Sequence, residues 1–186
     1  MGLEQLEFSI LYFFQELHTP LLDKIVPALT FLGNGGWFFI LLGIAFLCFR
    51  KTRKTGVIVL ISLAVGFLIG NLALKNLVMR DRPYWIDASV PLLIANPTDF
   101  SFPSGHTLAA FEAATGVFLE NKRWGIPMLL FAALIGLSRL YLFVHFPSDV
   151  LSGMALGIFI AWYVKRTIEK YQNHVILRGQ IKKKAE

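Results

Sequence analysis

Five long apolar runs constrain this chain more than any other feature of its sequence. Hydrophobic residues make up 55% of the chain, and charged residues gather between the runs. A soluble domain would break such runs into amphipathic segments, each with one polar face. The runs therefore predict an all-α fold, an integral membrane helical bundle with about five transmembrane helices. They cover roughly residues 37–49, 56–74, 107–120, 124–144 and 150–164.

The first 35 residues differ from the runs that follow them. Residues 3–17 mix apolar side chains with glutamates, so this segment is too short and too charged to cross a bilayer. A second short segment begins at Thr19 and ends at the glycines of 33–36. Amphipathic segments of this kind lie along a membrane interface. We therefore expect one membrane-embedded domain (1–172), which contains in-plane helices (1–35) and a transmembrane core (36–166). A basic cytoplasmic tail (173–186) follows it.

Basic residues mark one side of the predicted membrane. If every run crosses, the clusters at 50–54, 122–123 and 165–184 face the same side, and the positive-inside tendency makes that side cytoplasmic. The C-terminus then lies in the cytoplasm, while segment 75–106 and the turn at His145 lie outside. The formal net charge of +6 is thus a topology signal, and no nucleic-acid partner is expected.

Two cations stand at the outer end of the second run. Lys75 and Arg82 are seven residues apart, which is about two turns and about 10 Å along a helix that continues to Pro83. Both side chains would then point the same way. The alternative is a cationic helix end that reaches up to the lipid headgroups.

A short turn precedes the third run. In the sequence Pro103–His106, Ser104 suits the N-cap of the following helix, and Gly105 lets backbone N–H groups approach an anion there. His106 can exchange a proton near neutral pH. Taken alone, the turn is also compatible with an ordinary capped helix carrying an interfacial histidine.

The third polar cluster joins the fourth and fifth runs. Arg139 can hold phosphate oxygens with two parallel hydrogen bonds. His145 and Asp149 are four residues apart around a helix start at Pro147. A carboxylate that binds one ring nitrogen makes the other nitrogen a better nucleophile. The alternative is a structural pair that caps a helix.

Together, the clusters suit phosphoryl transfer through a phosphohistidine. Three cations would neutralise the phosphoryl oxygens, which is where catalysis of this reaction gains most. His145 would attack phosphorus, and His106 would protonate the leaving oxygen and later activate water. No metal and no cofactor is implied, because the carboxylates are too few and too scattered for a magnesium site.

The same residues resemble the three-part signature of the type 2 phosphatidic acid phosphatase family, in order and in spacing. The matching segments are Lys75–Pro83, Pro103–His106 and Ser138–Asp149. The resemblance implies a helical bundle that hydrolyses lipid phosphates or diphosphates without a metal. Many bacterial members have six spans, so five and six both stay open. The implied site comprises catalytic His145, His106 and Asp149, and substrate phosphate-binding Lys75, Arg82, Ser104, Gly105 and Arg139.

The expected function is therefore hydrolysis of a lipid phosphate in the cell membrane by a multi-pass enzyme whose site faces outward. Undecaprenyl diphosphate is the favoured substrate, with phosphatidylglycerophosphate or phosphatidic acid as alternatives. A lipid phosphotransferase would use the same residues, and a non-catalytic transporter or scaffold is the alternative from another class. The partners are the lipid substrate and membrane lipids, and the oligomeric state is not readable from the sequence.

Three further charged residues have predicted roles. Glu112 lies in the middle of the third run, where a hydrogen-bonded packing role is favoured over a proton relay. Asp81 stands beside Arg82 and could orient it, and Arg80 is interpreted as surface charge.

Overall fold

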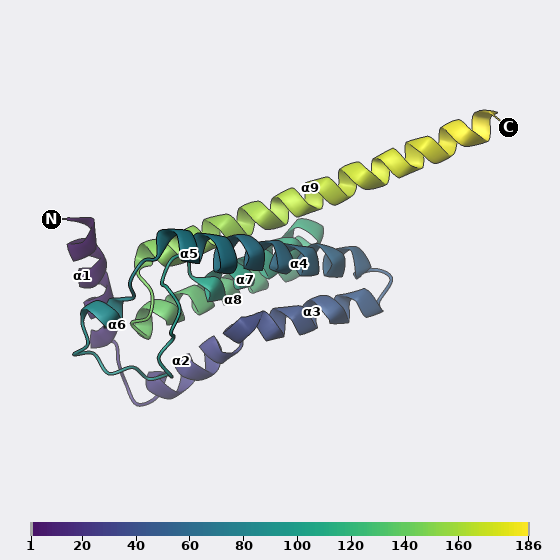
Figure 1. Cartoon of the computed structure of the whole chain (residues 1–186). Coiled ribbons are helices and arrows are strands. Elements are labelled where there is room, and N and C mark those ends of the chain that lie inside the picture. Colours follow the sequence, from purple (N-terminus) through teal and green to yellow (C-terminus); the bar gives the residue numbers. More distant parts are fainter. Residues whose placement is uncertain (1, 186) are drawn as a thin grey trace.

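The computed structural model describes residues 2–185, and these residues form helices joined by turns and one longer loop (Figure 1). No strand occurs among them, which confirms the predicted all-α bundle. The elements are α1 (Leu3–Glu16), α2 (Leu22–Phe31), the 3₁₀ turn η1 (Asn34–Gly36), α3 (Trp37–Cys48), α4 (Arg53–Gly66), the π-helix η2 (Phe67–Leu74), α5 (Lys75–Val78), α6 (Pro83–Ile86), α7 (Gly105–Glu120), α8 (Lys122–Tyr141) and α9 (Pro147–Ala185).

Helix α7 forms the centre of the bundle. It packs against α8, α9, α4 and α3, and most of its side chains are buried. Its small residues, among them Ala110, Ala113 and Ala114, let these neighbours approach closely. The helix has 16 residues and is about 24 Å long, which is short for a span. It is enclosed by protein rather than by lipid, so its ends need not reach the headgroups.

The outer helices turn large apolar side chains away from the core. On α8 these include Leu130, Leu134 and Leu137, and on α9 they include Phe159 and Tyr163. Such a surface would aggregate in water but suits contact with lipid chains. The structure thus has the inside-out distribution of apolar residues that the runs predict.

Three helical stretches are long and apolar enough to cross a membrane, namely Arg53–Ile86, Lys122–Tyr141 and Pro147–His174. Leu22–Phe31 and Asn34–Cys48 meet at a 43° bend and pass the same criteria as one broken span. Part of the region expected to lie in the membrane plane therefore continues into the first span. Helix α1 does lie across one end of the bundle, where it contacts α8 and α9 (Figure 1). Helix α9 runs on to Ala185 without a break at residue 173, the predicted start of the tail.

Two glycines bring α9 against α7. A Cβ atom on Gly153 would lie 2.7 Å from the carbonyl oxygen of Ser104, and one on Gly157 would lie 2.7 Å from that of Leu108. Glycines four residues apart let two helix backbones meet at close range. Because α9 begins next to Asp149 and α7 begins at Gly105, this contact fixes the distance between two of the predicted site segments.

We expect Gly157→Val to destabilise the protein, because the new side chain meets backbone that cannot move aside. Overpacking of this kind costs about 1–3 kcal/mol, and the melting temperature in detergent should fall by several degrees. The matched control is Ala155→Val on the exposed face of α9, which should leave the melting temperature unchanged. Equal melting temperatures for the two variants would contradict this account of the α7–α9 contact.

Candidate active site

The three predicted clusters meet at one end of the bundle, around a cavity of about 830 Å³. Residues from each cluster line it, and the lining residues with a predicted role are Lys75, Arg82, Gly105, His106, Arg139 and His145. Ser104 and Asp149 are fully buried. The structure therefore brings together residues that are up to 70 positions apart in the chain, six of them around one cavity.

Lys75 and Arg82 converge, but not by the predicted route. The helix ends at Val78, because Met79 adopts a left-handed conformation with φ of 47°. The argument from helical spacing is therefore wrong for Arg82, which lies in the extended segment before α6. The two cations meet because both bind Asp99. Lys75 Nζ contacts one carboxylate oxygen, and Arg82 Nη2 lies 2.7 Å from the other.

Asp99 is a site residue that sequence reasoning missed. It belongs to the irregular loop before α7, where no motif marks it. Arg82 Nε also donates to the backbone oxygen of Asp99 at 2.6 Å, so this residue, not Asp81, orients the guanidinium. Partial burial acts to raise the pKa of Asp99, but the hydrogen bonds and charges of Lys75 and Arg82 outweigh it and lower the pKa to about 2. Asp99 is thus an anion bound by two predicted phosphate ligands.

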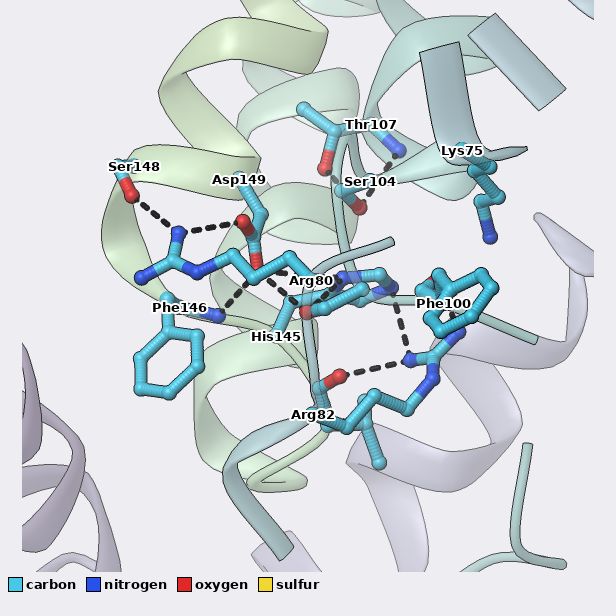
Figure 2. A network of polar contacts seen from close by, with 12 residues as sticks. Lys75, Arg80, Arg82, Phe100, Ser104, Thr107, His145, Phe146, Ser148 and Asp149 are labelled. Carbon is cyan, nitrogen blue, oxygen red and sulfur yellow. Dashed lines mark hydrogen bonds and ion pairs between the residues drawn. The ribbon is translucent and has the colours of Figure 1, made fainter. Parts of the chain in front are cut away.

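His145 is buried, with 1% of its surface exposed, and its two ring nitrogens have different neighbours. Nε2 lies 3.3 Å from Arg82 Nη1, a contact that a dashed line marks in Figure 2. Nδ1 lies 3.4 Å from Ser101 Oγ and 3.7 Å from Asp149 Oδ2. Burial lowers the pKa of His145 well below its ordinary value, and the charges of the nearby cations lower it further. The imidazole is therefore neutral at pH 7, with a lone pair available.

Asp149 is held by three hydrogen bonds. Its Oδ2 accepts from Ser101 Oγ at 2.5 Å and from the backbone N–H of Phe146 at 2.8 Å. Its Oδ1 accepts from Arg80 Nη1 at 2.7 Å (Figure 2). The predicted direct bond to His145 is absent among these contacts, because 3.7 Å exceeds hydrogen-bond range. Ser101 precedes the Pro103–His106 turn by two residues, and sequence reasoning missed it.

Arg80 is a partly buried link and not the surface charge that the sequence suggests. Its Nη2 donates to Glu7 Oε2 at 2.5 Å, and its guanidinium lies 4.1 Å from the ring centre of Phe146. Glu7 also accepts from the backbone N–H of Ser148 at 3.0 Å. Helix α1 therefore supports the start of α9 from the far end of the chain. No local pattern distinguishes Glu7 from the other glutamates of this segment.

The predicted turn before α7 has the expected cap. Ser104 Oγ accepts from the backbone N–H of Thr107, and its own N–H donates to the carbonyl of Asp149 at 3.1 Å. The two clusters are thus bonded directly. His106 Nε2 lies 2.8 Å from Asn34 Oδ1, which comes from η1. Gly105 leaves room for Asn71, whose Oδ1 would lie 2.9 Å from an added Cβ atom.

Arg139 completes the cation set. It is buried, and its Nη1 donates to Thr30 Oγ1 at 2.6 Å. Its Nε has no hydrogen-bond partner within the described part of the chain. A buried guanidinium with an unused donor at a cavity wall is suited to bind an oxyanion.

Glu112 makes no packing hydrogen bond to the described residues, contrary to the role that the sequence favours. It is 1% exposed and lines the same cavity, yet its Oε1 has no partner among the described residues. Gly66 makes room for it, since an added Cβ atom there would lie only 1.9 Å from Glu112 Oε1.

Three cations and the N-terminus of α7 surround one cavity, and a neutral histidine faces them. Arg139 and Arg82 can each offer several N–H donors, and backbone N–H groups at a helix start attract anions. A tetrahedral anion bound there would have its charge neutralised in a site of low dielectric, where each contact is strong. The arrangement can therefore bind a phosphate group and present a nucleophile to it.

Comparisons with known proteins agree with this chemistry. The profile of the PAP2 superfamily matches residues 55–172. Undecaprenyl-diphosphatase of Sulfolobus acidocaldarius is 35% identical over 117 residues, which are 62% of this chain and 56% of that protein. Undecaprenyl-diphosphatase BcrC of Bacillus subtilis is 30% identical over 145 residues, which are 78% of this chain and 74% of that protein.

A solved structure shows the same fold. The first transmembrane PAP2 type phosphatidylglycerolphosphate phosphatase from Bacillus subtilis has a TM-score of 0.75 at 28% identity, covering 90% of this chain and 86% of that chain. The profile match contains all three polar clusters, from Lys75 to Asp149. These findings confirm the family resemblance, and the chain belongs to the PAP2 superfamily as a multi-pass membrane lipid phosphatase.

Proposed function

We propose that this enzyme removes a phosphate from a lipid phosphate or diphosphate through a phosphohistidine on His145. The observation that carries the proposal is the position of His145 Nε2, which lies 3.3 Å from Arg82 at a cavity that Lys75 and Arg139 also line. The three cations supply the positive charge that a metal ion supplies in other phosphatases.

The reaction has two steps. His145 Nε2 attacks phosphorus, the bond to the leaving oxygen breaks, and His106 gives that oxygen a proton. Burial and the nearby cations lower the pKa of His106 to about 2 without substrate, and the negative charge of the bound phosphate must raise it for this step. In the second step His106 takes a proton from water, the water oxygen attacks phosphorus, and the P–N bond breaks. Lys75, Arg82 and Arg139 neutralise the phosphoryl oxygens throughout, with Ser104 and Gly105 placing the N–H groups of α7 beside them.

Undecaprenyl diphosphate is the substrate we propose, with undecaprenyl phosphate as the product. Two relatives with at least 30% identity carry the name undecaprenyl-diphosphatase, which supports this choice. A phosphatidylglycerophosphate or phosphatidic acid phosphatase is the second candidate, and the structural likeness to a phosphatidylglycerolphosphate phosphatase favours it. A phosphotransferase would share the first step but pass the phosphoryl group to a lipid acceptor.

The test is phosphate release by the purified protein from each of these lipids, with no acceptor lipid present. We expect undecaprenyl diphosphate to give the highest kcat/KM. His145→Ala should lower kcat by at least about 10³-fold, and His106→Ala by about 10²–10⁴-fold. His174→Ala, on the exposed C-terminal part of α9, is the matched control and should retain full activity.

The outcomes separate the alternatives. Full activity of folded His145→Ala would overturn the phosphohistidine mechanism. Phosphate release that requires an added lipid acceptor would indicate a phosphotransferase. A transporter or scaffold would be supported if the protein hydrolyses none of these lipids and His145→Ala leaves its other functions unaffected.

We propose that the site faces the extracytoplasmic side and that the C-terminus lies in the cytoplasm. The basic clusters at the opposite end of the helices support this orientation. A green fluorescent protein fused after Glu186 should fluoresce, and an alkaline phosphatase fused there should be inactive. The reverse pattern would invert the proposed topology.

Asp99 binds Lys75 and Arg82, two of the proposed phosphate ligands, so a phosphate must displace its carboxylate from them. The carboxylate is 56% exposed and lies on a loop, which gives it a route to solvent. We expect Asp99→Asn to bind anions more tightly, so that inorganic phosphate inhibits at about tenfold lower concentration. Asp87→Asn is the matched control in the same loop, because Asp87 bonds to Tyr12 and Ser89. Weaker inhibition of Asp99→Asn would show instead that Asp99 holds the cations in place for the substrate.

A further inference from the structure

The geometry points to Ser101 as a positioning residue that links Asp149 to the nucleophile, so that the carboxylate acts on His145 through a hydroxyl group. This inference rests on the proposed role of His145 as nucleophile. It assigns the orienting contact to a residue outside all three sequence clusters.

The contact distances support a bridge rather than a direct pair. His145 Nδ1 and Asp149 Oδ2 are 3.7 Å apart, beyond the range of an N–H···O bond. Ser101 Oγ is 2.5 Å from the carboxylate oxygen and 3.4 Å from the ring nitrogen. Its hydroxyl thus contacts both groups.

The bridge is held firmly in place. Ser101 is fully buried, and its backbone N–H donates to the carbonyl oxygen of Arg80 at 2.8 Å. The carboxylate that it binds is fixed by Arg80 on one oxygen and by Phe146 N–H on the other. Asp149 would have to give up these bonds to turn toward His145, which favours the bridged arrangement.

The bridge also selects a tautomer. An ionised carboxylate only accepts hydrogen bonds, so the single hydroxyl proton of Ser101 goes to Asp149. The oxygen of Ser101 is then an acceptor, and His145 must place its proton on Nδ1 to use it. The lone pair lies on Nε2, the nitrogen beside Arg82 at the phosphate site. As Nε2 bonds to phosphorus and the ring becomes positive, the hydroxyl bridge carries the stabilisation from Asp149 to Nδ1–H.

Ser101→Ala is the decisive variant. We expect kcat to fall by about 10- to 100-fold. KM and the inhibition constant of inorganic phosphate should change less than about threefold, because Ser101 contacts the nucleophile and not the phosphate ligands. Rapid-quench measurement should show the same loss in the rate of phosphohistidine formation. The matched control is Ser89→Ala, a serine of the same loop whose hydroxyl binds Asp87, and its kcat should equal that of the wild type. Ser101→Cys keeps a weak donor and should recover part of the rate.

A double-mutant cycle separates positioning from a general structural effect. In an Asp149→Asn background, Ser101→Ala should cost less than about threefold in kcat, because the two residues act through one chain of contacts. Full additivity of the two losses would overturn the bridge, as would a Ser101→Ala enzyme with more than half of the wild-type kcat.

A readout that needs no turnover distinguishes failure of the bridge from failure of the proposed function. In protein labelled with ¹⁵N-histidine, the His145 resonances should indicate the Nδ1–H tautomer in the wild type and a mixture of tautomers in Ser101→Ala. An Nε2–H tautomer in the wild type would overturn the inference even if the enzyme is active. Wild-type protein that shows the Nδ1–H tautomer but hydrolyses no lipid phosphate would support the bridge and refute the proposed function.

Discussion

The buried Asp149 carboxylate is the group on which the rest of the site depends. A charge with none of its surface exposed is tolerated only when it is paired and fully hydrogen-bonded. Arg80 supplies the opposite charge, Ser101 and Phe146 supply further donors, and Glu7 balances Arg80 in turn. These contacts join α1, the segment after α5, the loop before α7 and the start of α9. Satisfying one carboxylate therefore fixes four parts of the chain around the cavity.

The cations on the other side of His145 form the complementary half of the site. Lys75, Arg82 and Arg139 are all buried, and like charges brought together in a low dielectric repel one another. Asp99 pairs with the first two and offsets one of their two charges, whereas Arg139 has only the hydroxyl of Thr30 as a hydrogen-bond partner among the described residues. A site with excess positive charge around a neutral imidazole attracts an anion strongly. This fits a family whose members named in the comparisons act on lipid phosphates and diphosphates.

The sequence was most informative where the chemistry uses residues close together in the chain. The apolar runs indicated a helical membrane bundle, and the three clusters predicted six of the residues that line one cavity. Interpretation of single charged residues was weaker. The sequence predicts surface charge for Arg80, a pairing with Arg82 for Asp81 and a hydrogen-bonded role for Glu112, and the structure contradicts all three. The true role of each residue depends on a contact with a residue at least 17 positions away, or on the lack of any such contact. Periodicity in the sequence reveals neither.

What the sequence by itself determined is the membrane class, the helical fold and the set of reactive groups, because hydropathy and motif spacing are local properties of the chain. Only the tertiary structure decided how those groups are held. Met79 ended a helix that the pattern extended to Arg82, and Gly157 let α9 approach the backbone of α7 closely. Asp99, Ser101 and Glu7 entered the site through long-range hydrogen bonds. Such bonds form where folding buries charges that must be paired, and no single segment of the sequence specifies them.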